Sequence, residues 1–198
     1  MPTSLKGIRV LEMSQIMAGP TCGLLLADLG AEVIKVEKTT GGDDTRRFLP
    51  PDINGEAAAF MMMNRNKKGI ALNLKDKDGI EIFKRMVKNS DVVLENFRKG
   101  TLEKLGIGYE VISKINPKII LCEISGYGRT GPYADKGGFD LVAQGMSGLM
   151  SITGESKDKP PMKVGAPITD ITAGLLATSG ILAALVYRNK TGEGQKVD

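Results

Sequence analysis

The stretch GIRVLEMSQIMAGPTCGLLLADLGAEVIKVEK, residues 7–38, decides the fold that the sequence predicts. It has short apolar runs at its two ends, 7–13 and 32–38, and a longer apolar segment between them, 18–31. Short runs rich in Val and Ile are typical of buried strands. The middle segment has Pro20 in its first turn and a glycine at its end, which is typical of a helix. The stretch therefore predicts a strand, a helix and a second strand, the repeating unit of a parallel sheet.

The same alternation continues along the chain. Further strands are predicted at 69–75, 91–97 and 118–125, with the beginning of another at 196–198. Helices are predicted at 57–67, 76–90, 101–117 (as two short pieces) and 139–150, and an apolar helix follows Asp170. We expect an α/β fold, a Rossmann-like parallel sheet with flanking helices, in which 1–198 form one domain. Ligands of such sheets bind at the carboxyl ends of the strands.

Composition narrows the class of partner. The 198 residues carry a net charge of +4 without a long run of Lys or Arg, which suits a small polyanionic ligand and not a nucleic acid. The N-terminus has no signal-peptide pattern, and the tract after Asp170 is short for a membrane span, so we expect a cytoplasmic protein with a buried core helix there. Cys22 and Cys122 are expected to be reduced core thiols.

The chain has no histidine. Ser-His and Cys-His nucleophile pairs, imidazole acid–base catalysis and His-bound metals are therefore excluded for these residues. Two distant cysteines do not make a zinc site, and no metal site is predicted.

The segment GYGRTG, 126–131, matches the glycine pattern of dinucleotide-binding loops and follows a predicted strand. That pattern binds pyrophosphate only when it opens a helix. The residues that follow it, PYADKGG, predict a loop, so classical NAD binding is not favoured.

Several polar side chains follow predicted strands. Asn96 and Phe97 close the fourth strand, where an amide and an aromatic ring suit a purine ligand, although a core Phe with an Asn turn is an equal alternative. Lys38, Lys75 and Lys104 lie in or near strand-end loops, where they either meet phosphates or are simply solvated. The acidic and basic residues of 43–47 are expected to be solvated.

Asp170 is the lone charge before a long apolar segment, in GAPITDITAG. The plain interpretation is that Asp170, or Thr169 beside it, caps the helix, and the helix N-terminus keeps the carboxylate ionised. The alternative is that Asp170 is a nucleophile. The two roles are compatible, because a capping carboxylate can also face a cleft.

Together these segments resemble class III (family III) CoA-transferases, the family of the formyl-CoA and carnitine CoA-transferases. The resemblance rests on 5–38, NRNKKGIALNLK at 64–75, the stretch 91–133, GGFDLVAQGMSG at 137–148 and TGEGQKVD at 191–198. It covers essentially the whole chain but only the N-terminal half of a family member, so a fragment is expected. It implies the N-terminal large domain of an intertwined homodimer.

The resemblance also implies a reaction and a site. Asp170 occupies the place of the family's nucleophile, which carries CoA between two carboxylic acids through an aspartyl anhydride and an aspartyl-CoA thioester. Acyl-CoA and carboxylic acids are then the substrates, with no metal. The residues implied for CoA are Met17, Ala18, Lys38, Leu72, Lys75, Asn96, Phe97, Arg98 and Lys104, with Gly137, Gly138, Phe139 and Asp140 at the thioester end.

Two alternatives remain. Acyl-CoA racemases are similar to these transferases but use a His and an Asp as paired bases, and the His falls near Phe139, so the lack of histidine counts against racemization. The other alternative is a protein that binds CoA without catalysis. The formyl-CoA transferases have Gln where this chain has Met17, which argues against a formyl or oxalate substrate.

Overall fold

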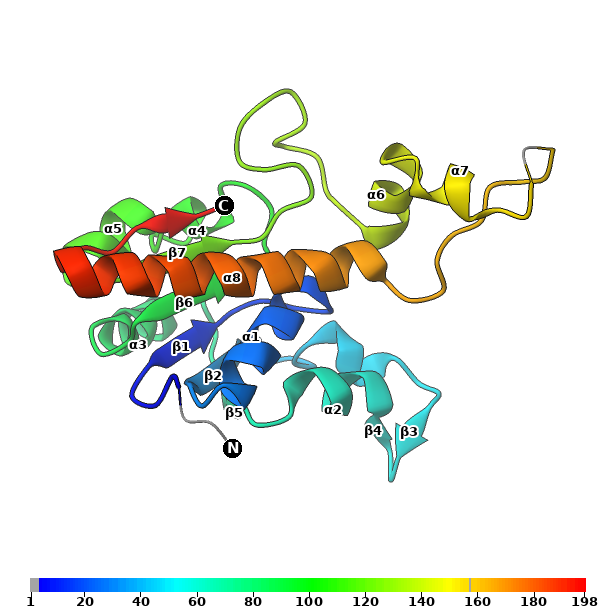
Figure 1. Cartoon of the computed structure of the whole chain (residues 1–198). Coiled ribbons are helices and arrows are strands. Elements are labelled where there is room, and N and C mark those ends of the chain that lie inside the picture. The colour runs from blue at the N-terminus through cyan, green and yellow to red at the C-terminus, as the bar shows by residue number, and fades with distance from the viewer. Residues whose placement is uncertain (1–3, 157) are drawn as a thin grey trace.

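A six-stranded, fully parallel sheet forms the centre of the protein (Figure 1). The fold is seen in a computed structural model that describes residues 4–156 and 158–198. The strands are β1 (Arg9–Glu12), β2 (Glu32–Glu37), β5 (Lys68–Ala71), β6 (Val92–Glu95), β7 (Ile120–Glu123) and β8 (Lys196–Val197). Their order is β5-β2-β1-β6-β7-β8, so the sheet grows outward in both directions from the junction of β1 and β6. This is the doubly wound Rossmann order, and the predicted α/β class is confirmed.

Helices cover both faces of the sheet. One face carries α1 (Ala18–Asp28) and α8 (Ile168–Thr191), with α2 (Ala58–Asn64) beside α1. The other carries α3 (Lys77–Val87), α4 (Thr101–Lys104) and α5 (Tyr109–Ile115). Alternate residues of β1 feed the two cores, since Val10 packs under α1 and α8 while Leu11 packs under α3 and α5. Burial on both faces explains why the strands are apolar runs and not alternating patterns.

Helices α1 and α8 touch at very short range. A Cβ atom added to Gly174 of α8 would lie 2.6 Å from the carbonyl oxygen of Ala18 in α1. The glycine therefore lets the second turn of α8 meet the first turn of α1 backbone to backbone. This contact sets the start of α8, and hence Asp170, against the loop that follows β1.

Helix α8 is buried on one side only. Ala177, Ile181 and Leu185 lie in the core, whereas Leu176 is 66% exposed on the opposite side. By length and composition the helix could also cross a membrane, although it packs here on α1 and the sheet. The predicted buried core helix is therefore confirmed for its inner side, while its outer side is exposed.

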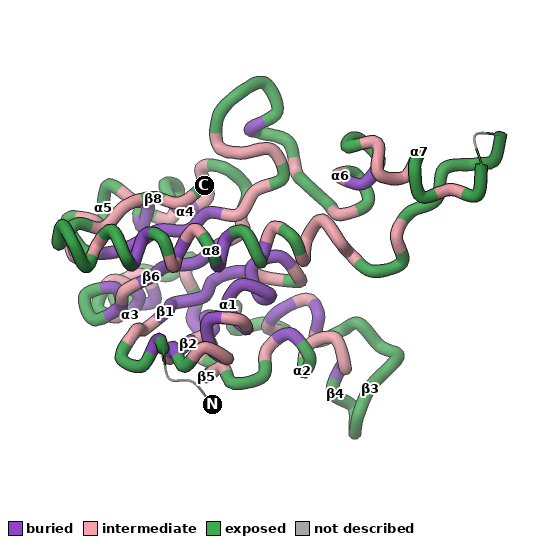
Figure 2. Tube along the Cα trace, viewed as in Figure 1, coloured by how far each residue is buried: buried purple, intermediate pink, exposed green. Residues whose placement is uncertain are grey.

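Several boundaries differ from the predicted ones. The expected strand 69–75 is the shorter β5, because the chain turns after Ala71. The expected helix 139–150 is divided into α6 (Asp140–Met146) and α7 (Leu149–Thr153) by Gly148, whose φ of 80° interrupts the helix. Both helices lie on a largely exposed arm that projects from the sheet (Figure 2).

The segment 39–56, for which the sequence predicts neither a helix nor a strand, contains short elements. They are a 3₁₀ turn, η1 (Asp44–Arg47), and a small hairpin of β3 (Asp52–Ile53) and β4 (Glu56–Ala57). Asp43 just before η1 is 1% exposed, so the prediction that this charged run is solvated was wrong at that position. Glu37 also pairs with Arg46 through two contacts of 2.7 and 2.8 Å.

Cys22 and Cys122 are free and buried in the core under α1 and α8, as predicted. The GYGRTG segment is followed by a long loop and not by a helix, which confirms the predicted loop.

Candidate active site

A cavity of about 500 Å³ opens where the carboxyl ends of β1, β6 and β7 meet. This is the point at which the strand order reverses, the usual ligand site of a doubly wound sheet. Its walls come from the loops after these three strands and from the first turn of α8. The predicted residues that it brings together are Met17, Ala18, Asn96, Phe97, Arg98, Gly137, Gly138, Phe139 and Asp170.

Five predicted residues do not line the cavity: Lys38, Leu72, Lys75, Lys104 and Asp140. The three lysines are exposed, and Lys38 forms an ion pair of 2.6 Å with Asp44. Leu72 is 7% exposed in the core under α3. Lys38 follows β2, Leu72 and Lys75 follow β5, and Lys104 ends α4, so these four lie outside the cavity.

The loop after β1 is held in an unusual conformation. Ile16 has a φ of 68°, in the left-handed region that a β-branched residue rarely adopts. Two side chains from other segments hold this turn. Asn96 accepts from the backbone N–H of Gln15 and donates to its carbonyl, both at 2.8 Å, and Asp43 accepts from the N–H of Ile16 at 3.2 Å. Asn96, predicted to bind a ligand, uses its amide to fix the cavity wall.

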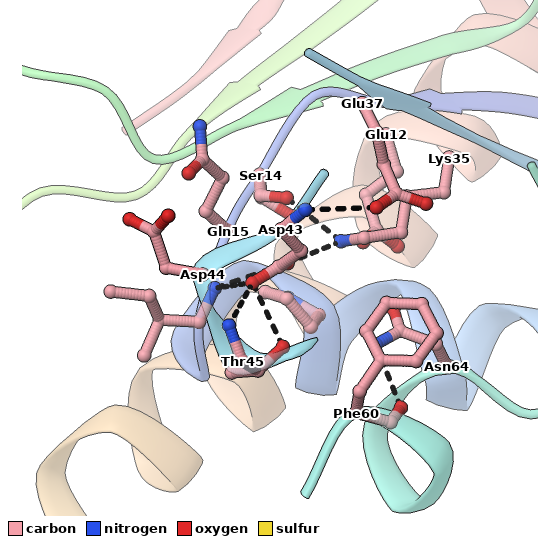
Figure 3. Close-up of polar contacts among 12 residues, drawn as sticks. Glu12, Ser14, Gln15, Lys35, Glu37, Asp43, Asp44, Thr45, Phe60 and Asn64 are labelled. Atoms are coloured by element: carbon pink, nitrogen blue, oxygen red, sulfur yellow. Dashed lines mark hydrogen bonds and ion pairs between the residues drawn. The ribbon is translucent and has the colours of Figure 1, made fainter. Parts of the chain in front are cut away.

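Asp43 belongs to a buried charge cluster, which we define as Glu12, Lys35, Asp43 and Lys67 (Figure 3 shows all but Lys67). The Lys35 ammonium lies 2.9 Å from both Glu12 and Asp43, and Lys67 lies 2.8 Å from Glu12. The two acids and two bases balance in charge, as buried ions require. Burial lowers the pKa of Lys67 to about 8, while for Lys35 burial is outweighed by Glu12 and Asp43, so its pKa is raised.

A second group of buried charges, formed by Arg129, Glu95 and Glu123, lies at the ends of β6 and β7. Arg129, on the loop after β7, contacts Glu95 and lies 3.4 Å from Glu123, the residues that close β6 and β7. It also donates to the carbonyl of Phe97 at 3.1 Å. Burial raises the pKa of Glu95 to about 7 despite the arginine. The group ties the ends of two strands to the loop that carries Gly137 and Gly138.

That loop approaches the end of β7 at very short range. A Cβ on Gly138 would lie 2.3 Å from the Cα of Gly126, and a Cβ on Gly126 would meet Gly138 equally closely. The first glycine of GYGRTG is therefore required by a backbone contact in this protein. It lets the segment 137–139 form one wall of the cavity.

Asp170 lies in the first turn of α8 and is partly buried. Its side chain makes no capping hydrogen bond, so the prediction that Asp170 caps the helix was wrong. The capping side chain is Asp140 of α6, which accepts from the N–H of Thr169 at 2.9 Å and from its hydroxyl at 2.7 Å. Burial raises the pKa of the Asp170 carboxyl, and the charge of Asp140 adds to the rise. The expectation that the helix terminus keeps Asp170 readily ionised is thereby reversed.

The sequence reasoning missed Glu12, Lys35, Asp43, Glu95 and Arg129. For Lys35 and Glu95 a signal was present, because a charged residue inside an otherwise apolar strand needs a buried partner. Nothing in the sequence indicated which residues pair with them. Among residues 4–156 and 158–198, no group of three or more acidic or Cys side chains is arranged to hold a metal ion.

Comparison with known proteins shows which family the chain is similar to. Residues 5–198 match the protein family described as CoA-transferase family III. The chain is 48% identical to succinate–glutarate CoA-transferase of Agrobacterium fabrum, over 98% of this chain and 50% of that protein. It is 47% identical to succinyl-CoA:glutarate CoA-transferase of Mus musculus, over 98% of this chain and 44% of that protein.

A solved structure agrees. The crystal structure of a CAIB/BAIF family protein from Brucella suis superimposes with a TM-score of 0.95 at 46% identity, covering all of this chain and 53% of that one. The chain thus spans about half the length of the relatives that it matches. It belongs to CoA-transferase family III.

Proposed function

We propose that the protein is a CoA-transferase that moves CoA from an acyl-CoA donor to a carboxylic acid acceptor, with Asp170 as the nucleophile. The proposal rests on the position of Asp170, which lines the cavity at the point where the strand order of the sheet reverses. The Asp170 side chain does not cap α8, and the pKa of its carboxyl is raised. A raised pKa makes the ionised carboxylate a stronger base and a better nucleophile. The names of the relatives add that dicarboxylic acids of four or five carbons are the first substrates to test.

The first half of the reaction transfers CoA to the protein. An oxygen of Asp170 attacks the thioester carbonyl carbon, the C–S bond breaks, and the CoA thiolate leaves behind an aspartyl anhydride. The thiolate then attacks the aspartyl carbonyl of that anhydride. The C–O bond to the donor breaks, the donor acid departs as a carboxylate, and Asp170 carries CoA as a thioester.

The second half runs the same steps in reverse order. The acceptor carboxylate attacks the aspartyl thioester and releases the thiolate, which then attacks the acceptor carbonyl and frees Asp170. No proton is gained or lost overall, so the exchange needs no imidazole base. A carboxylate is the residue type that this chemistry requires, because the group being exchanged passes between carboxylates.

The positively charged side chains in and near the cavity suit the phosphates of CoA. Arg98, Lys99 and Lys136 line the cavity beside Asp170. Lys38 and Lys75 lie beyond it, after β2 and β5, and adjacent strands are about 4.8 Å apart. We propose that the phosphates of CoA lie along this edge of the sheet while the pantetheine arm enters the cavity. Phe97 and Phe139 supply apolar surface within it.

The two alternatives make different predictions. A racemase needs a second base facing Asp170, and the resemblance implies that the His of the racemases falls near Phe139, while this chain has no histidine. Proton exchange at the α-carbon in deuterated water, without an acceptor acid, would support racemization. Binding of CoA with no acyl exchange would support a binding protein without catalysis.

Trapping of the intermediate tests the proposal. The full-length protein is incubated with succinyl-CoA, then treated with hydroxylamine or borohydride, and the modified residue is located by mass spectrometry. We expect the label on Asp170, formation of glutaryl-CoA when glutarate is added, and loss of both in Asp170→Asn at unchanged melting temperature. Wild-type exchange rates in Asp170→Asn would refute the assigned role.

The resemblance further implies a homodimer, which we propose as the working form. Leu175, Leu176 and Val186 leave the outer side of α8 apolar and exposed, as a helix with a partner surface would. The mass of the full-length protein in solution, measured by light scattering, tests this. A monomer at micromolar concentration would contradict it.

A further inference from the structure

We propose that Asp140 is a positioning residue for Asp170: from α6 it caps the first turn of α8, so that the Asp170 carboxylate is left to face the cavity. This inference rests on the proposed function for its catalytic meaning. It differs from the role that the resemblance implied, in which Asp140 contacts the thioester end of CoA. Asp140 does not line the cavity, and its oxygens are turned toward the helix.

The hydrogen bonds of Asp140 show what it holds. One carboxylate oxygen, Oδ1, accepts from the backbone N–H of Thr169 at 2.9 Å and from the Thr169 hydroxyl at 2.7 Å. The backbone N–H of Asp170 also favours the charged form of Asp140. These N–H groups are among those that a helix leaves unsatisfied in its first turn. They belong to the nucleophile and to the residue before it.

Gln144 fixes Asp140 in turn. It is fully buried although it lies on the exposed arm, and its Nε2 donates to Oδ2 of Asp140 at 2.7 Å. Its Oε1 accepts from the N–H of Val164 at 2.8 Å. Asp140 and Gln144 stand four residues apart on one side of α6 and bind both ends of the segment 164–169. We call this pair the α6 clasp.

The clasp has an electrostatic consequence for the nucleophile. An anion at a helix N-terminus is stabilised by the helix dipole, and that position is taken by Asp140. Asp170 then meets a fixed negative charge beside it, which disfavours its own ionised form. Although burial alone would raise the pKa of Asp140, the bonds from Thr169 and Gln144 lower it, so Asp140 is the member of the pair that stays charged.

The other charged groups around Asp170 are positive. Arg98 and Lys99 face the cavity from the loop after β6, and Arg129 and Lys136 from the loop after β7. Helix α1 contributes only the uncharged Ala18. Arg129 is held by Glu95 and Glu123, and Lys99 lies 3.7 Å from Asp135. Asp140 is the acidic side chain whose charge raises the pKa of the Asp170 carboxyl.

Replacing the charge while keeping the cap separates the two roles. Asp140→Asn retains an oxygen acceptor for Thr169 and removes the charge. With aspartate labelled by ¹³C, the titration of the Asp170 carboxyl in the full-length protein is expected to move to lower pH than in the wild type. The acid limb of the pH profile of kcat/KM should move in the same direction, with most of the rate kept at high pH. Asp158→Asn, the same change at an exposed position on the arm, is expected to leave both unchanged.

Removing the cap as well gives a different result. Asp140→Ala is expected to lower the melting temperature and to reduce kcat by about 100-fold, the loss that a displaced catalytic group produces, with a smaller change in KM. Should Asp140→Asn fail to fold, Asp140→Gln carries the same expectation, because its side-chain amide keeps an oxygen acceptor for Thr169 without a charge.

The outcome that overturns the proposal is an Asp140→Asn protein that is folded and has wild-type titration of Asp170. A purely structural role would lower the melting temperature in both variants without moving that titration. If wild-type protein neither exchanges CoA nor labels Asp170, the proposed function fails, but the titration still decides whether Asp140 acts on Asp170.

Discussion

Glu95 shows how single buried charges shape this molecule. It closes β6 with its carboxylate 1% exposed, where it accepts from the N–H of Phe97 at 2.5 Å and contacts Arg129. Lys35 plays a corresponding part at β2, where its ammonium joins Glu12 to Asp43. In both cases the buried charge holds a loop that lines the cavity. Glu95 binds the backbone of Phe97, and Lys35 pairs with Asp43, which in turn binds the backbone of Ile16. Such charges do little for stability, but each restricts a loop to one arrangement.

Glu95 makes stability depend on pH in a defined direction. Burial raises its pKa from 4.5 to about 7, so between these values the folded protein holds a proton that the unfolded chain has lost. The free energy of unfolding therefore falls as pH rises through this window, by up to about 3 kcal/mol. Relative to Glu95→Gln, the wild type should lose stability from about pH 4.5 to 7, as measured by urea unfolding at each pH.

The exposed Glu155 supplies the control for this measurement. Glu155→Gln should follow the wild-type pH dependence throughout, since Glu155 is exposed. Parallel curves for the wild type and Glu95→Gln would show that Glu95 does not titrate in this range.

Among the elements, the pair of α1 and α8 decides where the site lies. Helix α8 is the crossover that returns the chain to β8, and its second turn meets the first turn of α1 at Gly174. Helix α6 contacts the first turn of α8 and the segment before it through the α6 clasp. The position of Asp170 is therefore set by the contacts that α8 makes with α1 and with α6.

A methyl group at Gly174 should disturb this junction. In Gly174→Ala the Cβ would lie 2.6 Å from both the Ala18 oxygen and the Thr21 Cβ, and the backbone cannot yield as a flexible side chain would. We expect a loss of about 1–3 kcal/mol in the free energy of unfolding, together with weaker CoA binding. Denaturant unfolding and calorimetry measure the two effects.

Gly145→Ala is the matched control, because Gly145 is also helical and its added Cβ would only reach the Met150 sulfur at 3.6 Å. It should be neutral or stabilise by about 0.5–1 kcal/mol, since alanine favours helices over glycine. Equal losses in the two variants would mean that helix packing at Gly174 is not the cause.

Across the whole molecule, positive charge gathers at the carboxyl edge of the sheet. Arg98, Lys99 and Lys136 line the cavity, and Lys38 and Lys75 follow neighbouring strands, while the chain as a whole carries only +4. Exposed charges of this kind attract a polyanion but are screened beyond about 8 Å at physiological ionic strength. The distribution favours a ligand with several negative charges, such as phosphates.

Salt should therefore weaken CoA binding. We expect the dissociation constant of CoA, measured by calorimetry on the full-length protein, to rise steeply with sodium chloride. Pantetheine, which has the same arm without the phosphates, should bind weakly and with little dependence on salt. Equal salt dependence for the two ligands would place the phosphates away from these residues.

The order of local patterns along the chain was enough to determine the α/β class, the number of strands in the large sheet and the edge at which the cavity lies. The apolar runs of 7–13 and 32–38 reflect burial on both faces of a parallel sheet, a property that each strand carries in its own residues. The local sequence also made Asp170 a candidate, because it is the lone charge beside a long apolar segment. The predicted ends of the helix 139–150 and the strand 69–75 were wrong, because the chain turns at Gly148 and after Ala71 although the periodic pattern of the sequence continues.

Only the tertiary structure decided the partners of the charged residues. Asp43 with Lys35, Glu95 with Arg129 and Asp140 with the start of α8 are pairs between segments that are distant in the sequence or belong to different elements. Nothing local distinguishes Asp43 from its solvated neighbour Asp44, because burial depends on what the rest of the chain places around it. The sequence thus indicated Asp170 as a candidate, and the packing of α6 and α1 against α8 determined that Asp140 caps the helix and that Asp170 lines the cavity.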